Sequence, residues 1–224
     1  GLSLRQASTR LRRTIARVHD AGVAVCEEIG VARCDWRYVV VRDHQLNGAA
    51  GWDGEIYLNH GVVEETRNEA EIALLIAHEM AHQAAGHPAT ARRLWEAGWT
   101  IGWTVGHALD AFSGFGGGQG GPFTAWGVAC GTWIGGLLWS RQREREADAI
   151  AAVIVHRAGL DLDRARRLGF RLAHDDGQVQ SGPFDSHPLG AERLAVIDRA
   201  IAAARASGGR LPPRADGSPA GWVR

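Results

Sequence analysis

The sequence of 224 residues contains no lysine, so its 25 basic side chains other than histidine are all arginine. This absence excludes any mechanism that needs a catalytic lysine. The sequence also has no net charge, because 25 acidic residues balance the 25 arginines. Proteins that bind nucleic acids usually carry a basic excess. The charge balance therefore argues against a nucleic-acid-binding protein.

Cysteine is scarce, with only Cys26, Cys34 and Cys130. Their spacing fits neither a zinc ribbon nor a CxxC redox motif. Cys26 and Cys34 can pair in an oxidising compartment, but we expect all three cysteines to be small buried hydrophobic residues. Cysteine content therefore does not identify the cellular compartment.

The chain is long enough for one domain, and its hydrophobic content of 45% is enough for a folded core. We expect a single domain over residues 1–207. The segment 208–224 is rich in proline and glycine, so we expect a loose tail there.

Hydrophobic periodicity predicts a mostly helical α+β fold. Helices are expected at residues 3–29, from Asn68 to Gly86, at 140–158 and at 189–206. Asn68, followed three residues later by Glu71, forms a start that resembles a capping box. Two β-rich segments, 36–43 and 55–59, flank the turn-rich stretch 46–54. They predict a small antiparallel sheet ahead of the helix that begins at Asn68.

Residues 95–139 carry six of the nine tryptophans and two sets of glycines spaced by four. The glycines are at 98, 102 and 106, and at 127, 131 and 135. This spacing predicts a helical hairpin whose glycine faces allow two backbones to approach closely. Trp95, Trp99 and Trp103 form a parallel stripe, and the uncharged stretch 123–139 is short for a membrane span. The hairpin is expected either to pack on the domain, or to contact a membrane surface or cover the substrate.

Residues 76–87 read IAHEMAHQAAGH and contain the strongest functional signal. His78 and His82 are four residues apart on a predicted helix, so both imidazoles lie on one face within reach of one ion. Glu79 can reach a water on the same ion without being a ligand. This is the HExxH arrangement of zinc hydrolases, and it predicts one Zn²⁺ per chain.

The third ligand is expected from a distant segment, because no histidine or aspartate lies six residues after His82. The sequence EREAD places Glu144 and Asp148 four residues apart on one face of the predicted helix 140–158. Glu144 can complete a catalytic set of two histidines and one glutamate. Asp148 can accept a hydrogen bond from the second ring nitrogen of a ligating histidine.

Two alternatives concern this predicted third ligand. Glu146 is the rival ligand, but it lies about 200° round the helix from Glu144. Glu144 could instead form an ordinary helical ion pair with Arg141 or Arg145. The presence of HExxH upstream favours Glu144 as the ligand.

The order of three motifs resembles the HtpX-like and CAAX-prenyl-protease family of gluzincin metallopeptidases. The motifs are HEMAH at 78–82, EREAD at 144–148 and SHPLGAER at 186–193, and the similarity includes NGAAGWDGEIYLNHGVVEE at 47–65. The resemblance implies a zincin-like fold and a polypeptide substrate. It also raises the expectation of membrane-surface contact through 95–139.

The resemblance also implies that His187 and Arg193 lie close to the metal cleft. His187 would assist the oxyanion or act as a switchable fourth ligand. The alternative is a loop histidine before a helix and an exposed helical arginine.

The expected reaction is hydrolysis of a peptide bond, with Glu79 as the general base. The strand at 55–59 is expected to bind the substrate as an added β-strand, with Gly54, Ile56 and Leu58 in contact with it. The expected substrates are membrane, envelope or precursor proteins.

Two other functions remain open, namely a zinc-bound but inactive binding module and a helical domain without metal. Prenyl-protein proteolysis is a narrower alternative. The sequence leaves periplasmic, cytoplasmic and membrane-surface locations open.

Overall fold

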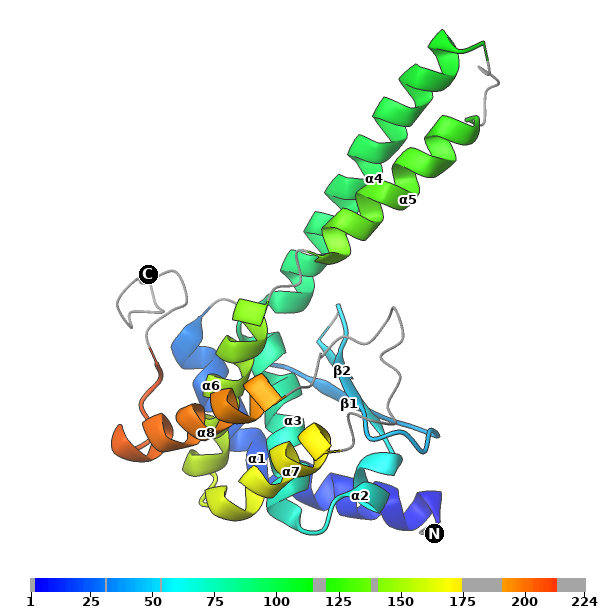
Figure 1. The fold of residues 1–224 in the computed structure, drawn as a ribbon. Helices are drawn as coiled ribbons and strands as arrows, with labels where there is room; N and C mark the ends of the chain where they lie inside the picture. Colours follow the sequence, from blue (N-terminus) through cyan, green and yellow to red (C-terminus); the bar gives the residue numbers. More distant parts are fainter. Residues whose placement is uncertain are drawn as a thin grey trace. The chain divides into compact units, whose positions relative to one another are not determined.

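The computed structural model describes residues 3–30, 32–52, 54–114, 120–137, 141–174 and 191–212. The chain divides into two compact units, Gly1–Gly86 with Gln142–Arg224 (unit 1) and His87–Arg141 (unit 2). The described elements are α1 (Leu4–Ile29), β1 (Arg37–Val41), β2 (Gly48–Ala50), β3 (Glu55–Asn59), α2 (Gly61–Glu65), α3 (Glu69–Ala84), α4 (His87–Phe112), α5 (Pro122–Leu137), α6 (Arg141–Arg157), α7 (Leu162–His174) and α8 (Ala191–Ala206) (Figure 1). The prediction of a mostly helical fold with a small sheet is confirmed.

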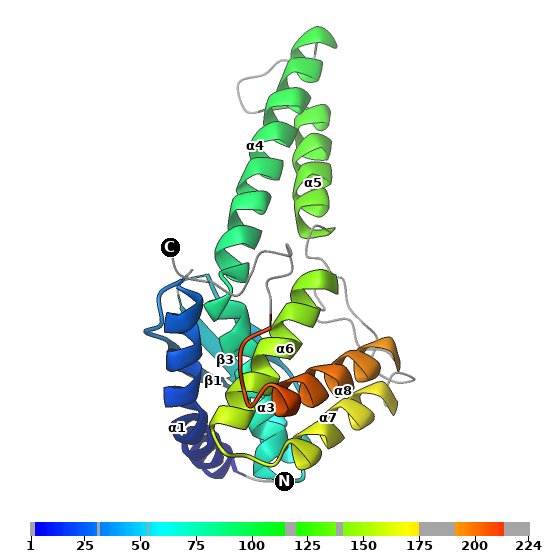
Figure 2. The ribbon, with the colours of Figure 1, turned by 90° about the vertical axis from the view of Figure 1, so that its left-hand side faces the viewer.

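Helix α3 occupies the middle of unit 1 (Figures 1 and 2) and contacts α1, α7, β2 and β3. Of its 16 residues, 14 are buried. Five of them are polar or charged, namely Glu71, His78, Glu79, His82 and Gln83. Burying a polar group costs free energy unless the group has a hydrogen-bond partner or an ionic partner. These five side chains therefore need partners on the elements that pack against α3.

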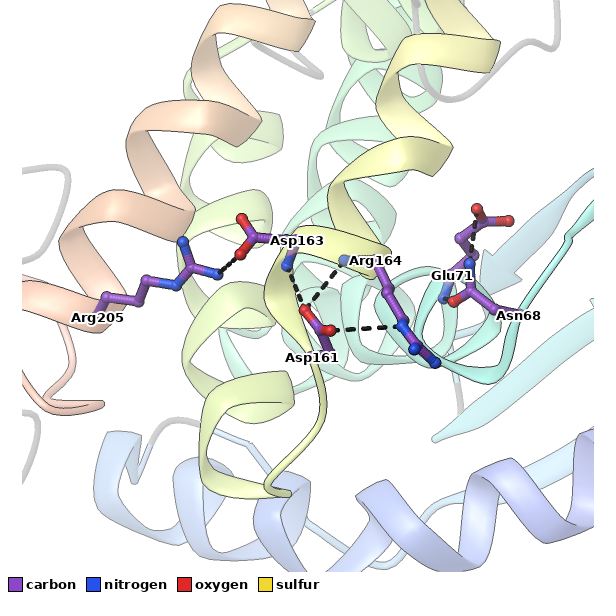
Figure 3. Close-up of polar contacts among 6 residues, drawn as sticks. All are labelled: Asn68, Glu71, Asp161, Asp163, Arg164 and Arg205. Carbon is purple, nitrogen blue, oxygen red and sulfur yellow. Dashed lines mark hydrogen bonds and ion pairs between the residues drawn. The ribbon is translucent and has the colours of Figure 1, made fainter.

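Side-chain caps fix the starts of α3 and α7 (Figure 3). Asn68 accepts a hydrogen bond from the Glu71 N–H at 3.1 Å, as the sequence predicted. The Glu71 carboxylate accepts a hydrogen bond from the Arg67 N–H. In a capping box it would accept from the N–H of the cap residue, Asn68, so the contact here is one residue earlier. Asp161 accepts from the N–H groups of the second and third residues of α7.

An exposed ion pair links α7 to α8, since Arg205 Nη2 lies 2.7 Å from Asp163 Oδ2 (Figure 3). The hydrogen bond from Arg205 lowers the pKa of the Asp163 carboxyl. Because both side chains are exposed to solvent, this pair contributes little to stability. Helix α7 itself was not predicted.

The sheet is mixed, with strand order β1-β3-β2. β1 pairs with β3 in parallel, with Tyr38 opposite Ile56, so the predicted antiparallel pairing of these two strands is wrong. The antiparallel partner of β3 is β2, which lies inside the stretch predicted as a turn. Gly48 and Ala50 have weak strand propensity, and the pairing with β3 overrides it.

The cysteine prediction is wrong for two of the three residues. Cys26 and Cys34 form a disulfide. Cys26 lies in the last turn of α1, and Gly30 follows with a φ of 67°, a left-handed conformation that ends the helix. The chain then reverses and brings the two Cα atoms within 5.8 Å, a separation that a disulfide spans. Cys130 is a free cysteine.

The end of unit 1 packs on α6. Arg157 Nε donates to the Gly209 carbonyl at 2.8 Å, and its Nη1 lies 2.7 Å from Glu28 Oε2 on α1. Leu211 is buried. The start of the segment predicted as a loose tail therefore has fixed contacts, and residues 213–224 lie outside the described residues.

Unit 2 is a helical hairpin of α4 and α5, as the glycine spacing predicted. A Cβ atom on Gly102 would lie 2.1 Å from the carbonyl oxygen of Gly127, and one on Gly131 would lie 2.0 Å from that of Gly98. Only glycine permits this approach of two backbones. Among the described helices, none is both long and apolar enough to span a membrane.

Asp110 joins the end of α4 to the start of α5 through hydrogen bonds. Its buried carboxylate accepts hydrogen bonds from the N–H groups of Gly121, Phe123 and Thr124, and from the Thr124 hydroxyl at 2.6 Å. Burial raises the pKa of Asp110, but these hydrogen bonds outweigh it and hold the pKa below the ordinary value. The contribution of Asp110 to stability is therefore present at neutral pH and is lost as the pH falls through that lowered pKa.

We expect Gly102→Ala to separate α4 from α5 locally, because the added methyl group meets backbone atoms that cannot move aside. The cost should be about 1–3 kcal/mol. Hydrogen exchange measures this loss of stability, because the α4 and α5 amides should exchange faster in the variant than in the wild type. Thr104→Ala, at an exposed position of the same helix, is the control. Unchanged protection in Gly102→Ala would contradict close packing of α4 against α5 at Gly102.

Candidate metal centre

The candidate site lies on α3, where the helical repeat stacks His78 and His82 on one face. Both imidazoles are buried, and their Nε2 atoms are 3.0 Å apart. Two imidazole nitrogens at this distance point toward one common position. The geometry is the one that the four-residue spacing predicted.

Helix α6 brings Glu144 to the same place. Its Oε2 lies 3.3 Å from His78 Nε2, and its Oε1 lies 3.3 Å from His82 Nε2. Glu144 is 5% exposed, so this is a buried contact rather than a surface ion pair. The three side chains each offer a ligand atom, and these atoms lie within 4.8 Å of one another.

The donor set and its spacing fit a zinc ion. Ligand atoms about 2.0–2.1 Å from zinc at the corners of a tetrahedron lie roughly 3.3–3.4 Å apart. The three separations here are 3.0, 3.3 and 3.3 Å. Two imidazoles and one carboxylate leave a fourth position for water or substrate, as in catalytic zinc sites.

Asp148 lies one turn after Glu144 on α6 and is also buried. Its Oδ1 is 3.0 Å from His78 Nδ1. A carboxylate only accepts hydrogen bonds, so the proton of a neutral His78 belongs on Nδ1, and the lone pair of Nε2 then faces Glu144. Glu146, the rival ligand, is only partly buried and does not belong to the cluster of ligand atoms.

Glu79 follows His78 and is 2% exposed. Strand β2 passes beside it, since a Cβ atom on Gly48 would lie 3.1 Å from Glu79 Cγ and 3.0 Å from Leu75 Cδ2. A larger residue at this position would press on the Glu79 side chain. The lack of a side chain at Gly48 therefore leaves room for that carboxylate.

Gln83 links α3 to the turn after β2 and to the first residue of β3. Its Nε2 donates to the carbonyl oxygens of Gly51 and Glu55, at 2.8 and 2.9 Å. Sequence reasoning missed Gly48 and Gln83 as positioning residues. The Asn-Gly pair at 47–48 signals only a turn, and no periodicity distinguishes Gln83 from other buried residues of α3.

The predicted substrate strand needs a correction. β3 is the central strand, paired on one side with β1 and on the other with β2, so it has no edge to offer. Ile56 and Leu58 are fully buried in the core. Gly54 has a φ of 77° in the turn before β3, and its carbonyl accepts from the Arg37 N–H. These three residues therefore do not form a substrate surface.

Two other predicted site residues remain predictions. His187 lies outside the described residues. Arg193 belongs to α8, but its side chain is outside the described part of the chain.

The sequence profile of Peptidase family M48 matches residues 12–201. The chain belongs to peptidase family M48. Among its relatives, the β-barrel assembly-enhancing protease of Escherichia coli K12 is 24% identical over 182 residues, covering 80% of this chain and 37% of that protein. The mitochondrial metalloendopeptidase OMA1 of Schizosaccharomyces pombe is 27% identical over 172 residues, covering 75% and 48%.

This M48 chain thus spans less than half of the length of either relative. Family M48 is a family of metallopeptidases. The cluster of His78, His82 and Glu144 offers ligand atoms of the kind that zinc binds, in agreement with this membership. Neither relative confirms the narrower resemblance to HtpX-like or CAAX-prenyl proteases, which stays a prediction.

We expect Asp148→Asn to weaken zinc binding by about 10–100-fold, because an amide holds the ring of His78 less firmly than a carboxylate. Competition with a zinc chelator measures the affinity. Glu146→Gln, two residues away on α6, is the matched control and should bind zinc like the wild type. Equal affinities for Asp148→Asn and the wild type would show that the contact with His78 is not part of the site.

Proposed function

We propose that this M48 chain is a zinc-dependent endopeptidase, with His78, His82 and Glu144 as the metal ligands. The proposal rests on one observation, the convergence of three buried ligand atoms from α3 and α6 within 4.8 Å. Zinc held by such a set makes a coordinated water more acidic and polarises a carbonyl group.

Glu79 is the proposed general base. It lies next to a ligand in sequence and is buried beside the cluster, and it is not one of the three converging residues. Its carboxylate takes the proton of the attacking water and delivers it to the leaving amine. Asp148 is proposed to hold His78 in the tautomer that presents Nε2 to the ion.

We propose that the substrate lies along β2 instead of β3. β2 is at an edge of the sheet, and its Gly48 approaches the Glu79 side chain. An extended peptide can add to a sheet edge through backbone hydrogen bonds, which need no particular sequence. The substrate would still bind as an added β-strand, as predicted, but beside β2 and not beside β3.

The proposed substrates are proteins of a membrane or cell envelope. The names of the two relatives place one in β-barrel assembly and the other in mitochondria. The disulfide between Cys26 and Cys34 supports an oxidising compartment, because such bonds are rare in the cytosol.

Unit 2 is proposed to contact a membrane surface. Trp95, Trp99 and Trp103 follow one face of α4, and each is between 41% and 43% exposed. Indole rings favour the boundary between water and lipid, because one part of the ring is apolar and the N–H is polar.

We expect Glu79→Gln to bind zinc normally and to hydrolyse an unfolded protein substrate about 10²–10⁴-fold more slowly than the wild type. Metal analysis and a peptide-cleavage assay measure the two properties separately. Glu144→Ala should lose the zinc of this centre and the cleavage activity, and Glu65→Gln, an exposed control on α2, should lose neither.

Two outcomes would overturn the proposed function. Wild-type chain that binds zinc but cleaves no substrate would favour the inactive binding module. Glu79→Gln that cleaves at the wild-type rate would remove Glu79 from the mechanism.

We expect the triple substitution of Trp95, Trp99 and Trp103 by alanine to weaken binding to phosphatidylcholine vesicles by about tenfold or more. Co-sedimentation with vesicles measures the binding. Trp52→Ala removes an exposed tryptophan from unit 1 and is the control. Equal sedimentation of the wild type and the triple variant would exclude the tryptophan stripe as a membrane-contacting surface.

A further inference from the structure

A second cluster of metal-ligating side chains lies in unit 1 and shares no residue with the first. His44, His60 and Glu64 each offer one ligand atom, and these atoms lie within 4.8 Å of one another. Glu64 Oε2 is 2.8 Å from His44 Nδ1 and 3.8 Å from His60 Nε2. The two imidazole rings meet edge to face, with their centroids 4.3 Å apart.

The backbone holds the cluster in place. His44 belongs to the loop after β1, and two hydrogen bonds hold the end of β1 and this loop against the start of α2. The His60 N–H donates to Val41 O at 3.0 Å, and the Gly61 N–H donates to Asp43 O at 2.9 Å. A Cβ atom on Gly61 would lie 2.1 Å from His44 O, so a glycine is needed for this approach.

His60 is the buried member of the cluster, with 3% of its surface exposed. Its Nδ1 has no hydrogen-bond partner among the described residues, and its Nε2 is beyond hydrogen-bond distance of Glu64. A buried ring nitrogen without a hydrogen-bond partner is costly. A ligand that accepts the lone pair of this ring would offset that cost.

We propose that His44, His60 and Glu64 form a second binding site for a divalent transition metal such as Zn²⁺. Two imidazoles favour zinc and its neighbours over magnesium or calcium, which prefer oxygen ligands. His44 is 81% exposed, so an ion can enter from solvent. Binding replaces the proton that His44 and Glu64 share, and it joins the loop after β1 to α2.

The test counts zinc ions bound by the metal-free full chain, using equilibrium dialysis against micromolar Zn²⁺ followed by elemental analysis. The variants are His44→Ala, Glu144→Ala and the double variant. His44 is exposed, so its replacement should leave the fold intact, and circular dichroism checks this. His107→Ala removes a histidine of unit 2 that belongs to neither cluster, and it controls for non-specific binding.

The expected result is two zinc ions in the wild type and in His107→Ala, one in His44→Ala, and none in the double variant. His44→Ala should retain peptide cleavage. The proposal is overturned if the wild type binds a single zinc that Glu144→Ala loses, or if His44→Ala still binds two.

The two metal sites can fail separately. A single zinc in the wild type that is lost in His44→Ala and kept in Glu144→Ala would support the second site. That outcome would overturn the proposed peptidase centre. A wild-type chain that binds no zinc would overturn both.

Discussion

The contact between α3 and α6 is the interaction on which the site and much of the core depend. It buries His78, His82, Glu144 and Asp148 together, and each of these groups loses its hydration. Asp148 lies against Nδ1 of His78, while the Nε2 atoms of both histidines and the Glu144 carboxylate lie within 3.3 Å of one another. The proposed divalent cation would resolve this arrangement, and metal binding and helix packing would then stabilise each other.

The main role of the sheet is to position side chains of α3. Strand β2 has only three residues, and the segment from β2 to the start of β3 contacts the site-bearing helix α3 at two places. Gly48 makes room for the Glu79 side chain, and Gln83 donates hydrogen bonds to the carbonyl oxygens of Gly51, after β2, and Glu55, the first residue of β3. These contacts hold the sheet edge beside the proposed general base.

Local signals in the sequence were enough to predict α3, its Asn68 cap and the shared face of His78 and His82. The helical repeat also indicated that Glu144 and Asp148 would lie together, and the structure brings both to His78. These features depend on residues three or four positions apart. The glycine spacing of the hairpin has the same local character.

The failures are features that depend on distant contacts. The parallel pairing of β1 with β3 requires β2 to lie on the far side of β3, which the short Gly-Ala-Ala segment does not reveal. The disulfide requires the reversal at Gly30. The second histidine cluster forms because a loop folds back on α2, and no spacing between His44 and His60 indicates this.

The order of the elements has a consequence for synthesis. Glu144 follows His82 by 62 residues (144 − 82), and all of unit 2 is encoded between them. At ribosomal rates of about 5–20 residues per second, Glu144 is translated roughly 3–12 s after His82. During this interval the nascent chain carries the HExxH sequence without its proposed glutamate ligand, so the proposed peptidase centre stays incomplete until Glu144 has been made.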